Sequence, residues 1–183
     1  MTAKGHSMDA IRQSFHTFDQ ITGAVDRVVQ VAIVIIFVVL FALLNLQVAM
    51  RYLVRIPMIW LEELAGFLLA YLTLWGSSAC IRTDRHVRVS FLLDRIQRLA
   101  ARRVLSIVVH LIMLFYLYYL VVYGYQFAAM GSGEITPSGT FDFFLPRLSL
   151  TTGGVLMVLQ TLGVIFREII GLLGVPTAQE DSA

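Results

Sequence analysis

Residues 28–50 read VVQVAIVIIFVVLFALLNLQVAM, an apolar run that contains no charged side chain. A helix needs about 20 such residues to cross the roughly 30 Å hydrocarbon core of a bilayer. The run is too long for the core of a signal peptide, and no small-residue cleavage site follows it. It therefore predicts an uncleaved first transmembrane helix.

Three further apolar runs occupy residues 58–80, 104–126 and 148–172, and each is long enough to span a membrane. Of the 183 residues, 58% are hydrophobic and 14% are charged, whereas a soluble domain carries about 25% charged residues. A water-soluble protein of this size could not cover so much apolar surface. We therefore predict an all-α integral membrane protein with four transmembrane helices.

The four helices form one membrane domain, residues 28–172, between a polar N-terminal segment, residues 1–27, and a short tail, residues 173–183. Lys and Arg residues are divided unevenly. The side with both termini and the connection between helices two and three has 11, and the other side has 3. Positive charge is enriched on the cytoplasmic side. This bias predicts cytoplasmic termini, with residues 51–57 and 127–146 facing outward.

The connection between helices two and three has a second pattern, SFLLDRIQRLAARR at residues 90–103. Its aliphatic residues fall on one helical face, and its polar and basic residues, which include Arg95, Arg98 and Arg102, fall on the other. The pattern predicts an interfacial amphipathic helix with its arginines on phospholipid phosphates. A solvated helical connector is the alternative.

The second helix carries two carboxylates, Glu62 and Glu63, just inside Trp60, which is placed to anchor the helix at the membrane interface. The same face continues with small residues that permit close approach of another helix: Gly66, Ala70, Thr73, Ser77 and Cys80. The opposite face is bulky and suits either lipid or packing: Leu61, Leu64, Leu68, Tyr71 and Trp75.

Carboxylates within a span are costly and usually face protein or water. The glutamates could therefore form a proton or cation site, or an ion pair or hydrogen bond that fixes packing. We favour the packing interpretation because both lie near the membrane interface.

Other polar residues in the spans predict packing. Asn45, Gln160 and Thr161 are expected to form interhelical hydrogen bonds. His110 is the only histidine in a span, which is typical of a hydrogen-bonded packing residue. Five tyrosines crowd the third helix: Tyr123 and Tyr125 fit an outer aromatic belt, while Tyr116, Tyr118 and Tyr119 are too deep and should pack against other helices.

Catalytic signatures are missing from the sequence. It contains no nucleophile–base constellation, no redox pair and no phosphate-binding glycine loop, and Cys80 is the single cysteine. We therefore predict that the protein is not an enzyme and has no catalytic, cofactor-binding or metal-binding residues. We also expect no nucleic-acid partner.

The run from Trp60 to Arg95 resembles the small membrane subunit, the DctQ-like family, of tripartite ATP-independent periplasmic (TRAP) transporters. The resemblance rests on Pro57, W-L-E-E at residues 60–63, Gly76, H-V-R-V at 86–89, D-R-I at 94–96, and Pro146 followed by Gly153-Gly154. The sequence departs from the family pattern at Ser90, where we would expect Asp. Ser and Asp are comparable helix caps, so only a charge-specific role is in doubt.

The resemblance implies a multi-pass protein of the bacterial inner membrane that works in a system of three parts. A periplasmic binding protein captures an organic acid, and a large membrane subunit moves it inward, driven by a sodium gradient. The small subunit would be the scaffold beside the large one, with a transient contact to the binding protein. Residues Glu62, Glu63, Gly66, Ala70, Thr73 and Ser77 would then be subunit-interface or packing residues.

Two other classes of function remain open. One is a self-sufficient small oligomeric cation-coupled transporter that uses Glu62 or Glu63 as its coupling carboxylate. The other is the membrane anchor of a redox complex. A stoichiometric membrane partner would favour the scaffold, transport by the isolated chain would favour the small transporter, and a visible-absorbing cofactor would favour the anchor.

Overall fold

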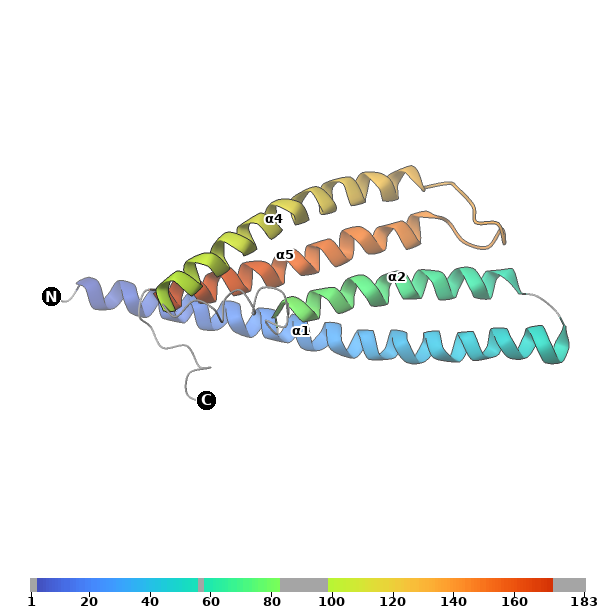
Figure 1. The fold of residues 1–183 in the computed structure, drawn as a ribbon, viewed down its shortest axis with the longest axis horizontal. Coiled ribbons are helices and arrows are strands. Elements are labelled where there is room, and N and C mark those ends of the chain that lie inside the picture. Colours follow the sequence, from blue (N-terminus) through green and yellow to red (C-terminus); the bar gives the residue numbers. More distant parts are fainter. Residues whose placement is uncertain (1–2, 56–57, 83–98, 173–183) are drawn as a thin grey trace.

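The computed structural model describes residues 3–55, 58–82 and 99–172, and four long helices account for most of them. These are α1 (Ala3–Ala49), α2 (Ile59–Arg82), α4 (Leu99–Met130) and α5 (Phe144–Leu172), and a π-helical turn, η1 (Met50–Val54), extends α1 (Figure 1). Four segments are long and apolar enough to cross a membrane: Thr22–Val54, Ile59–Ile81, Val104–Met130 and Phe144–Phe166. The predicted all-helical, four-span architecture is confirmed in this respect.

The predicted helix ends differ from the observed ones. Helix α1 begins at Ala3, so it extends well beyond the predicted span, residues 28–50. Its 47 residues extend about 70 Å, because hydropathy marks where a helix enters lipid and not where the helix begins. Helix α5 begins at Phe144, before Pro146. A proline is tolerated in a first helical turn, where its missing N–H has no intrahelical role.

The predicted amphipathic helix, residues 90–103, falls largely outside the described residues. Its last five residues, 99–103, form the start of α4. Arg102 therefore belongs to the first turns of a long helix, while Arg95 and Arg98 lie outside the described part of the chain.

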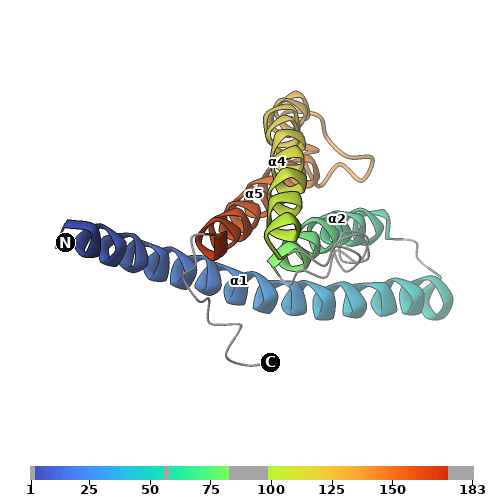
Figure 2. The same ribbon diagram turned by 60° about the vertical axis from the view of Figure 1, so that its left-hand side comes forward.

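Helix α5 occupies the centre of the bundle, with α4 on one side and α2 on the other, while α1 packs mainly on α2 (Figures 1 and 2). Two adjacent glycines allow this arrangement. A Cβ atom on Gly153 would lie 2.6 Å from Leu74 Cβ on α2, and one on Gly154 would lie 2.9 Å from Val121 Cγ2 on α4. Consecutive helical residues point about 100° apart, so the pair provides close contact with two neighbours at once.

The bulky face of α2 packs on α5. The Tyr71 hydroxyl donates to the carbonyl oxygen of Leu145 at 2.8 Å, and Trp75 Nε1 donates to Thr152 Oγ1 at 3.3 Å. This face was predicted to meet either lipid or another helix, and at Tyr71 and Trp75 it meets another helix. A small apolar core joins three helices: Ile81 of α2, Leu117 of α4, and Met157 and Val164 of α5.

Short polar side chains within the spans bond mainly to their own helices. Asn45 Nδ2 donates to Phe41 O at 2.7 Å, and Thr161 Oγ1 donates to Met157 O at 2.8 Å. The predicted interhelical bonds of Asn45 and Thr161 are therefore wrong. A side chain with one or two rotatable bonds reaches the carbonyl one turn back without a partner helix.

His110 has the hydrogen-bonded packing role predicted for it. The buried imidazole places Nδ1 2.7 Å from the carbonyl oxygen of Ser106, so this nitrogen carries the proton. The Ser106 hydroxyl in turn donates to Glu168 Oε1 at 3.2 Å, which joins α4 to α5.

The prediction for the deep tyrosines is wrong within this chain. Tyr116, Tyr118 and Tyr119 are exposed on the side of α4 away from α5, and no helix of the described chain covers them. Their spacing indicates a face of α4 but not which neighbour, if any, meets that face.

Candidate functional site

The two glutamates of α2 lie near the end of the bundle that also carries η1 and the α4–α5 loop, residues 131–143 (Figure 1). Glu63, in the second turn of α2, is half-buried. Its carboxylate accepts a hydrogen bond from the backbone N–H of Ser138 at 2.9 Å and another from the Ser138 hydroxyl. A loop that connects α4 to α5 is thereby fixed to α2.

Glu62 points elsewhere. Its carboxylate lies 3.8 Å from Arg51 Nη2 in η1, and both side chains are exposed. An exposed pair at this distance contributes little. The two adjacent carboxylates therefore do not converge on one point, and each has a partner from a different segment.

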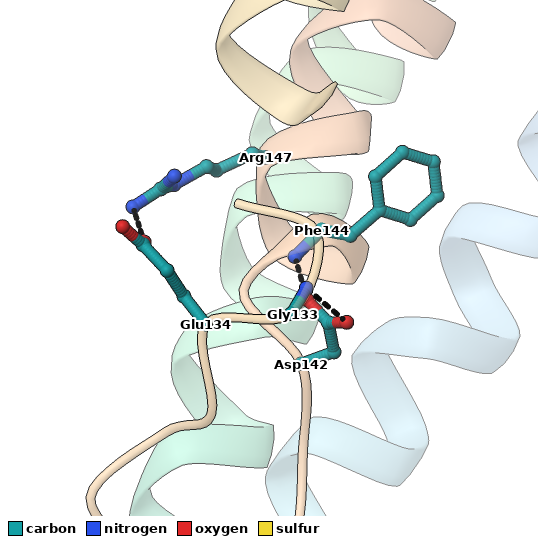
Figure 3. A network of polar contacts seen from close by, with 5 residues as sticks. All are labelled: Gly133, Glu134, Asp142, Phe144 and Arg147. Atoms are coloured by element: carbon teal, nitrogen blue, oxygen red, sulfur yellow. Dashed lines mark hydrogen bonds and ion pairs between the residues drawn. The ribbon is translucent and has the colours of Figure 1, made fainter. Parts of the chain in front are cut away.

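The α4–α5 loop has its own internal order. Residues 135 and 142 form an isolated antiparallel bridge, and the Asp142 carboxylate accepts from the backbone N–H of Gly133 at 3.0 Å and of Phe144 at 2.8 Å (Figure 3). The bond from Phe144, then that from Gly133, holds the pKa of Asp142 below its ordinary value, because both stabilise the ionised carboxylate. The Asp142 side chain thus holds the two ends of the loop, at Gly133 and Phe144, close together at the start of α5.

Arg147 completes this end of the bundle. Its guanidinium donates to Glu134 Oε2 at 2.7 Å (Figure 3) and lies over two rings, 4.6 Å from the centroid of Phe127 and 5.3 Å from that of Phe143. A Cβ atom on Gly131 would lie 2.7 Å from Arg147 Nη1, so this glycine makes room for the arginine. The α4–α5 loop is therefore a preformed surface and not a loose connection.

The small residues of α2, which we call the α2 seam (Gly66, Ala70, Thr73 and Ser77), face away from the other helices. Gly66, Thr73 and Ser77 are exposed and Ala70 is half-buried. A Cβ atom on Gly66 would meet nothing within 4 Å. The hydroxyls of Thr73 and Ser77 donate to carbonyls of their own helix, both at 2.8 Å. Within the described chain, the α2 seam is an uncovered surface that allows close approach.

The remaining predicted site residues are peripheral. Trp60 is exposed in the first turn of α2, at the same end as the α4–α5 loop. Among the described residues, no three His, Cys, Asp or Glu side chains gather into a group that could hold a metal ion.

Sequence reasoning missed three residues that order this end of the bundle: Ser138 and Asp142 in the α4–α5 loop, and Arg147 in the first turn of α5. The available signal was weak. An Asp two residues before a helix start is typical of a capping residue, whereas nothing local links Ser138 to Glu63, which lies 75 residues away.

Comparison with known proteins places these features in a family context. The sequence model of the family described as tripartite ATP-independent periplasmic transporters, DctQ component, matches residues 40–171. The sialic acid TRAP transporter small permease protein SiaQ of Vibrio cholerae is 30% identical over 155 residues, which make up 84% of this chain and 88% of that protein.

A second similarity is shorter. The sialic acid TRAP transporter permease protein SiaT of Haemophilus influenzae is 37% identical over 57 residues. These make up 31% of this chain and only 9% of that permease.

Proposed function

Because the chain belongs to the DctQ component family of tripartite ATP-independent periplasmic transporters, we propose that it is the scaffold and assembly subunit of a binding-protein-dependent importer driven by a sodium gradient. The chain is a transporter component and not an enzyme. The observation that carries the scaffold role is that these polar groups of α2 are hydrogen-bonded within this chain. The Glu63 carboxylate accepts hydrogen bonds from the α4–α5 loop, and the hydroxyls of the α2 seam donate to carbonyls of their own helix.

The partner is a large membrane subunit of the same transporter. The description of the family as a component of a tripartite system supports this, and so does the match of a 57-residue segment inside a much longer permease. The α2 seam supplies the contact, because its small residues are uncovered in this chain and permit close helix approach. A periplasmic binding protein contacts the assembled pair transiently.

The substrate is an organic acid. Two similar proteins are named for sialic acid, so an acidic sugar is the first substrate to test. In this chain the described polar groups of the spans are few and mostly bonded within the chain. We therefore place substrate selection in the binding protein and the large subunit.

The chain lies in the bacterial inner membrane with both termini in the cytoplasm. The uneven division of Lys and Arg supports this orientation, which puts the outer loop and η1 in the periplasm. The amphipathic pattern of residues 90–103 supports a place in the cytoplasmic interface, where Arg95, Arg98 and Arg102 would meet phospholipid phosphates. Replacing Leu92, Ile96 and Leu99 together with Ser should weaken assembly, and unchanged assembly and uptake would mean that the segment is only a connector.

The test of the scaffold role is reconstitution in proteoliposomes with a sodium gradient, the binding protein and labelled organic acids. Glu63→Leu should lower recovery of the two-subunit complex, with uptake falling in proportion, so that transport per assembled complex is unchanged. Glu62→Leu, which loses only an exposed pair, is the matched control and should have the smaller effect.

Two results would contradict the proposal. Gradient-driven uptake by this chain alone would favour the self-sufficient transporter. A Glu63 variant that assembles fully and transports nothing would assign the carboxylate to the transport step.

A further inference from the structure

In the middle of α4, between Phe115 and Tyr125, six exposed aromatic side chains cover the part of the helix that α5 does not cover. We call these residues the α4 aromatic face: Phe115, Tyr116, Tyr118, Tyr119, Tyr123 and Tyr125, which are between 43% and 65% exposed. Several of the rings contact one another. Tyr119 lies edge-on to Phe115 at 5.0 Å between centroids and stacks on Tyr123 at 5.9 Å with an angle of 9°.

The tyrosines nearest the middle of α4 are too deep for the membrane–water interface. The span of α4 is Val104–Met130, and its midpoint falls at Leu117. Tyr118 and Tyr119 are therefore within about 3 Å of the midpoint along the helix axis, while the hydrocarbon core extends about 15 Å to either side. A tyrosine hydroxyl lies about 6.5 Å from its Cα atom and cannot reach the headgroups from this depth.

The deep hydroxyls also differ from the other polar groups of the spans. Asn45, Thr73 and Ser77 donate to carbonyls of their own helix. A tyrosine hydroxyl stands too far from its own backbone to do so, and Tyr71 is satisfied instead by Leu145 O on a neighbouring helix. Within the described residues, no acceptor meets the hydroxyls of the α4 aromatic face.

Lipid alone does not suit this face. The exposed side of α1 shows what a lipid-facing surface of this chain looks like, because the exposed residues between 31 and 41 are all apolar and carry no hydroxyl: Val31, Val34, Ile35, Phe37, Val38, Val39 and Phe41. A hydroxyl in hydrocarbon without a partner is costly. The α4 aromatic face therefore requires hydrogen-bonding groups at the middle of the membrane.

We propose that the α4 aromatic face binds a transmembrane helix of the large membrane subunit that presents hydrogen-bond acceptors to Tyr118 and Tyr119. The inference rests on the proposed function, which supplies that partner. The α4 aromatic face would be a contact separate from the α2 seam, because α5 lies between α4 and α2. A second copy of this chain fits less well through α1, because residues 31–41 of that helix are all apolar and offer no side-chain acceptor.

Photo-crosslinking in the intact transporter tests the occupant. Benzoyl-phenylalanine at Tyr119 should form an adduct with the large subunit, whereas the same group at Phe37, exposed on α1, should form none. The same group at Thr73 reports on the α2 seam. An adduct from Thr73 without one from Tyr119 would overturn this inference and leave the proposed function standing. No adduct from either position would contradict both, and an adduct between two copies of this chain at Tyr119 would overturn the assignment of the occupant.

Removal of the hydroxyls tests the chemistry. The double variant Tyr118→Phe, Tyr119→Phe keeps both rings, so the isolated chain should have unchanged thermal stability. Its recovery with the large subunit at limiting concentration should fall about five- to tenfold, as expected for two lost hydrogen bonds in a membrane. Tyr52→Phe, which removes an exposed hydroxyl in η1, should assemble normally. Normal assembly of the double variant would show that hydroxyl recognition is not the basis of this contact.

Discussion

Glu63 and Ser138 are 75 residues apart in the sequence, and the glutamate carboxylate accepts two hydrogen bonds from the serine, one from its backbone N–H and one from its hydroxyl. This contact fixes the α4–α5 loop to α2, so three helices share one ordered end. A carboxylate within a predicted span, which could have formed a proton or cation site, is used here to hold a loop against α2.

The first prediction concerns this contact. Glu63→Leu removes both acceptors, so residues 131–143 should exchange their amide hydrogens faster, by an order of magnitude or more, when measured by mass spectrometry of the purified complex. Glu62→Leu should leave exchange in this loop unchanged, because its carboxylate contacts Arg51 and not the loop. Equal acceleration in both variants would show that the loop depends on the general charge of this end.

The second prediction concerns pH. The backbone N–H groups of Phe144 and Gly133 hold the pKa of Asp142 below its ordinary value. The Asp142 carboxylate therefore stabilises the loop fully above the pKa that Asp has in the unfolded chain, about 4. This stabilisation is lost as pH falls from there through the lower pKa of Asp142 in the folded chain. A spin label at exposed position 140, in a Cys80→Ser background, should be immobile at pH 6 and gain mobility only below pH 4.

Asp142→Asn is the control for the pH prediction. An amide does not titrate in this range, so the mobility of the same label should no longer change between pH 6 and pH 3. A transition that persists in Asp142→Asn would assign the pH dependence to another group.

The third prediction concerns the close crossing of α2 and α5. Gly153→Ala places a Cβ atom 2.6 Å from Leu74 Cβ, and overpacking of this kind costs about 1–3 kcal/mol. The melting temperature of the purified chain in detergent should fall by several degrees. Gly163→Ala, whose Cβ would lie 3.8 Å from Thr22 Cγ2, should have little effect.

The double variant Gly153→Ala, Leu74→Ala sharpens this test. The contact is with the Cβ atom of Leu74, which alanine retains, so shortening Leu74 should not restore stability. If stability were restored, the clash would involve the outer part of the Leu74 side chain and not its Cβ atom.

The sequence predicted the four spans because hydropathy over about 20 residues responds directly to the thickness of the membrane. It also predicted the small-residue face of α2, since helical spacing fixes which residues share a face. Neither signal indicates which neighbour meets a face. For this reason the bond between Glu63 and Ser138 and the exposure of Tyr118 and Tyr119 could not be predicted. The start of α1 at Ala3 could not be predicted either, because hydropathy marks the part of a helix that lies in lipid and not the polar turns before it.

The fourth prediction concerns orientation. Cys80 is exposed near the C-terminal end of α2, and the charge bias places this end in the cytoplasm. In intact cells Cys80 should resist a membrane-impermeant maleimide and react only after permeabilisation. A cysteine at Ser132, which is exposed and has no part in the Glu63 contact, should react in intact cells. The reverse pattern of labelling would invert the topology.

The last prediction separates the stability of the chain from the assembly of the transporter. Gly66 lies on the α2 seam, and a Cβ atom there would meet nothing within 4 Å in this chain. Gly66→Leu should therefore leave the melting temperature of the isolated chain unchanged or slightly raised, since leucine has the higher helix propensity. The same side chain should block the close approach of a helix of the large subunit, so recovery of the two-subunit complex should fall at least tenfold.

Gly66→Ala should have an intermediate effect on recovery, because helix contacts at small residues respond to each added carbon. Val38→Phe, on the exposed apolar side of α1, adds comparable bulk where only lipid is expected and should not affect assembly. Copurification from membranes and differential scanning fluorimetry of the isolated chain provide the two measurements. If Gly66→Leu assembled normally, the α2 seam would face lipid, and the large subunit would have to bind through another surface such as the α4 aromatic face.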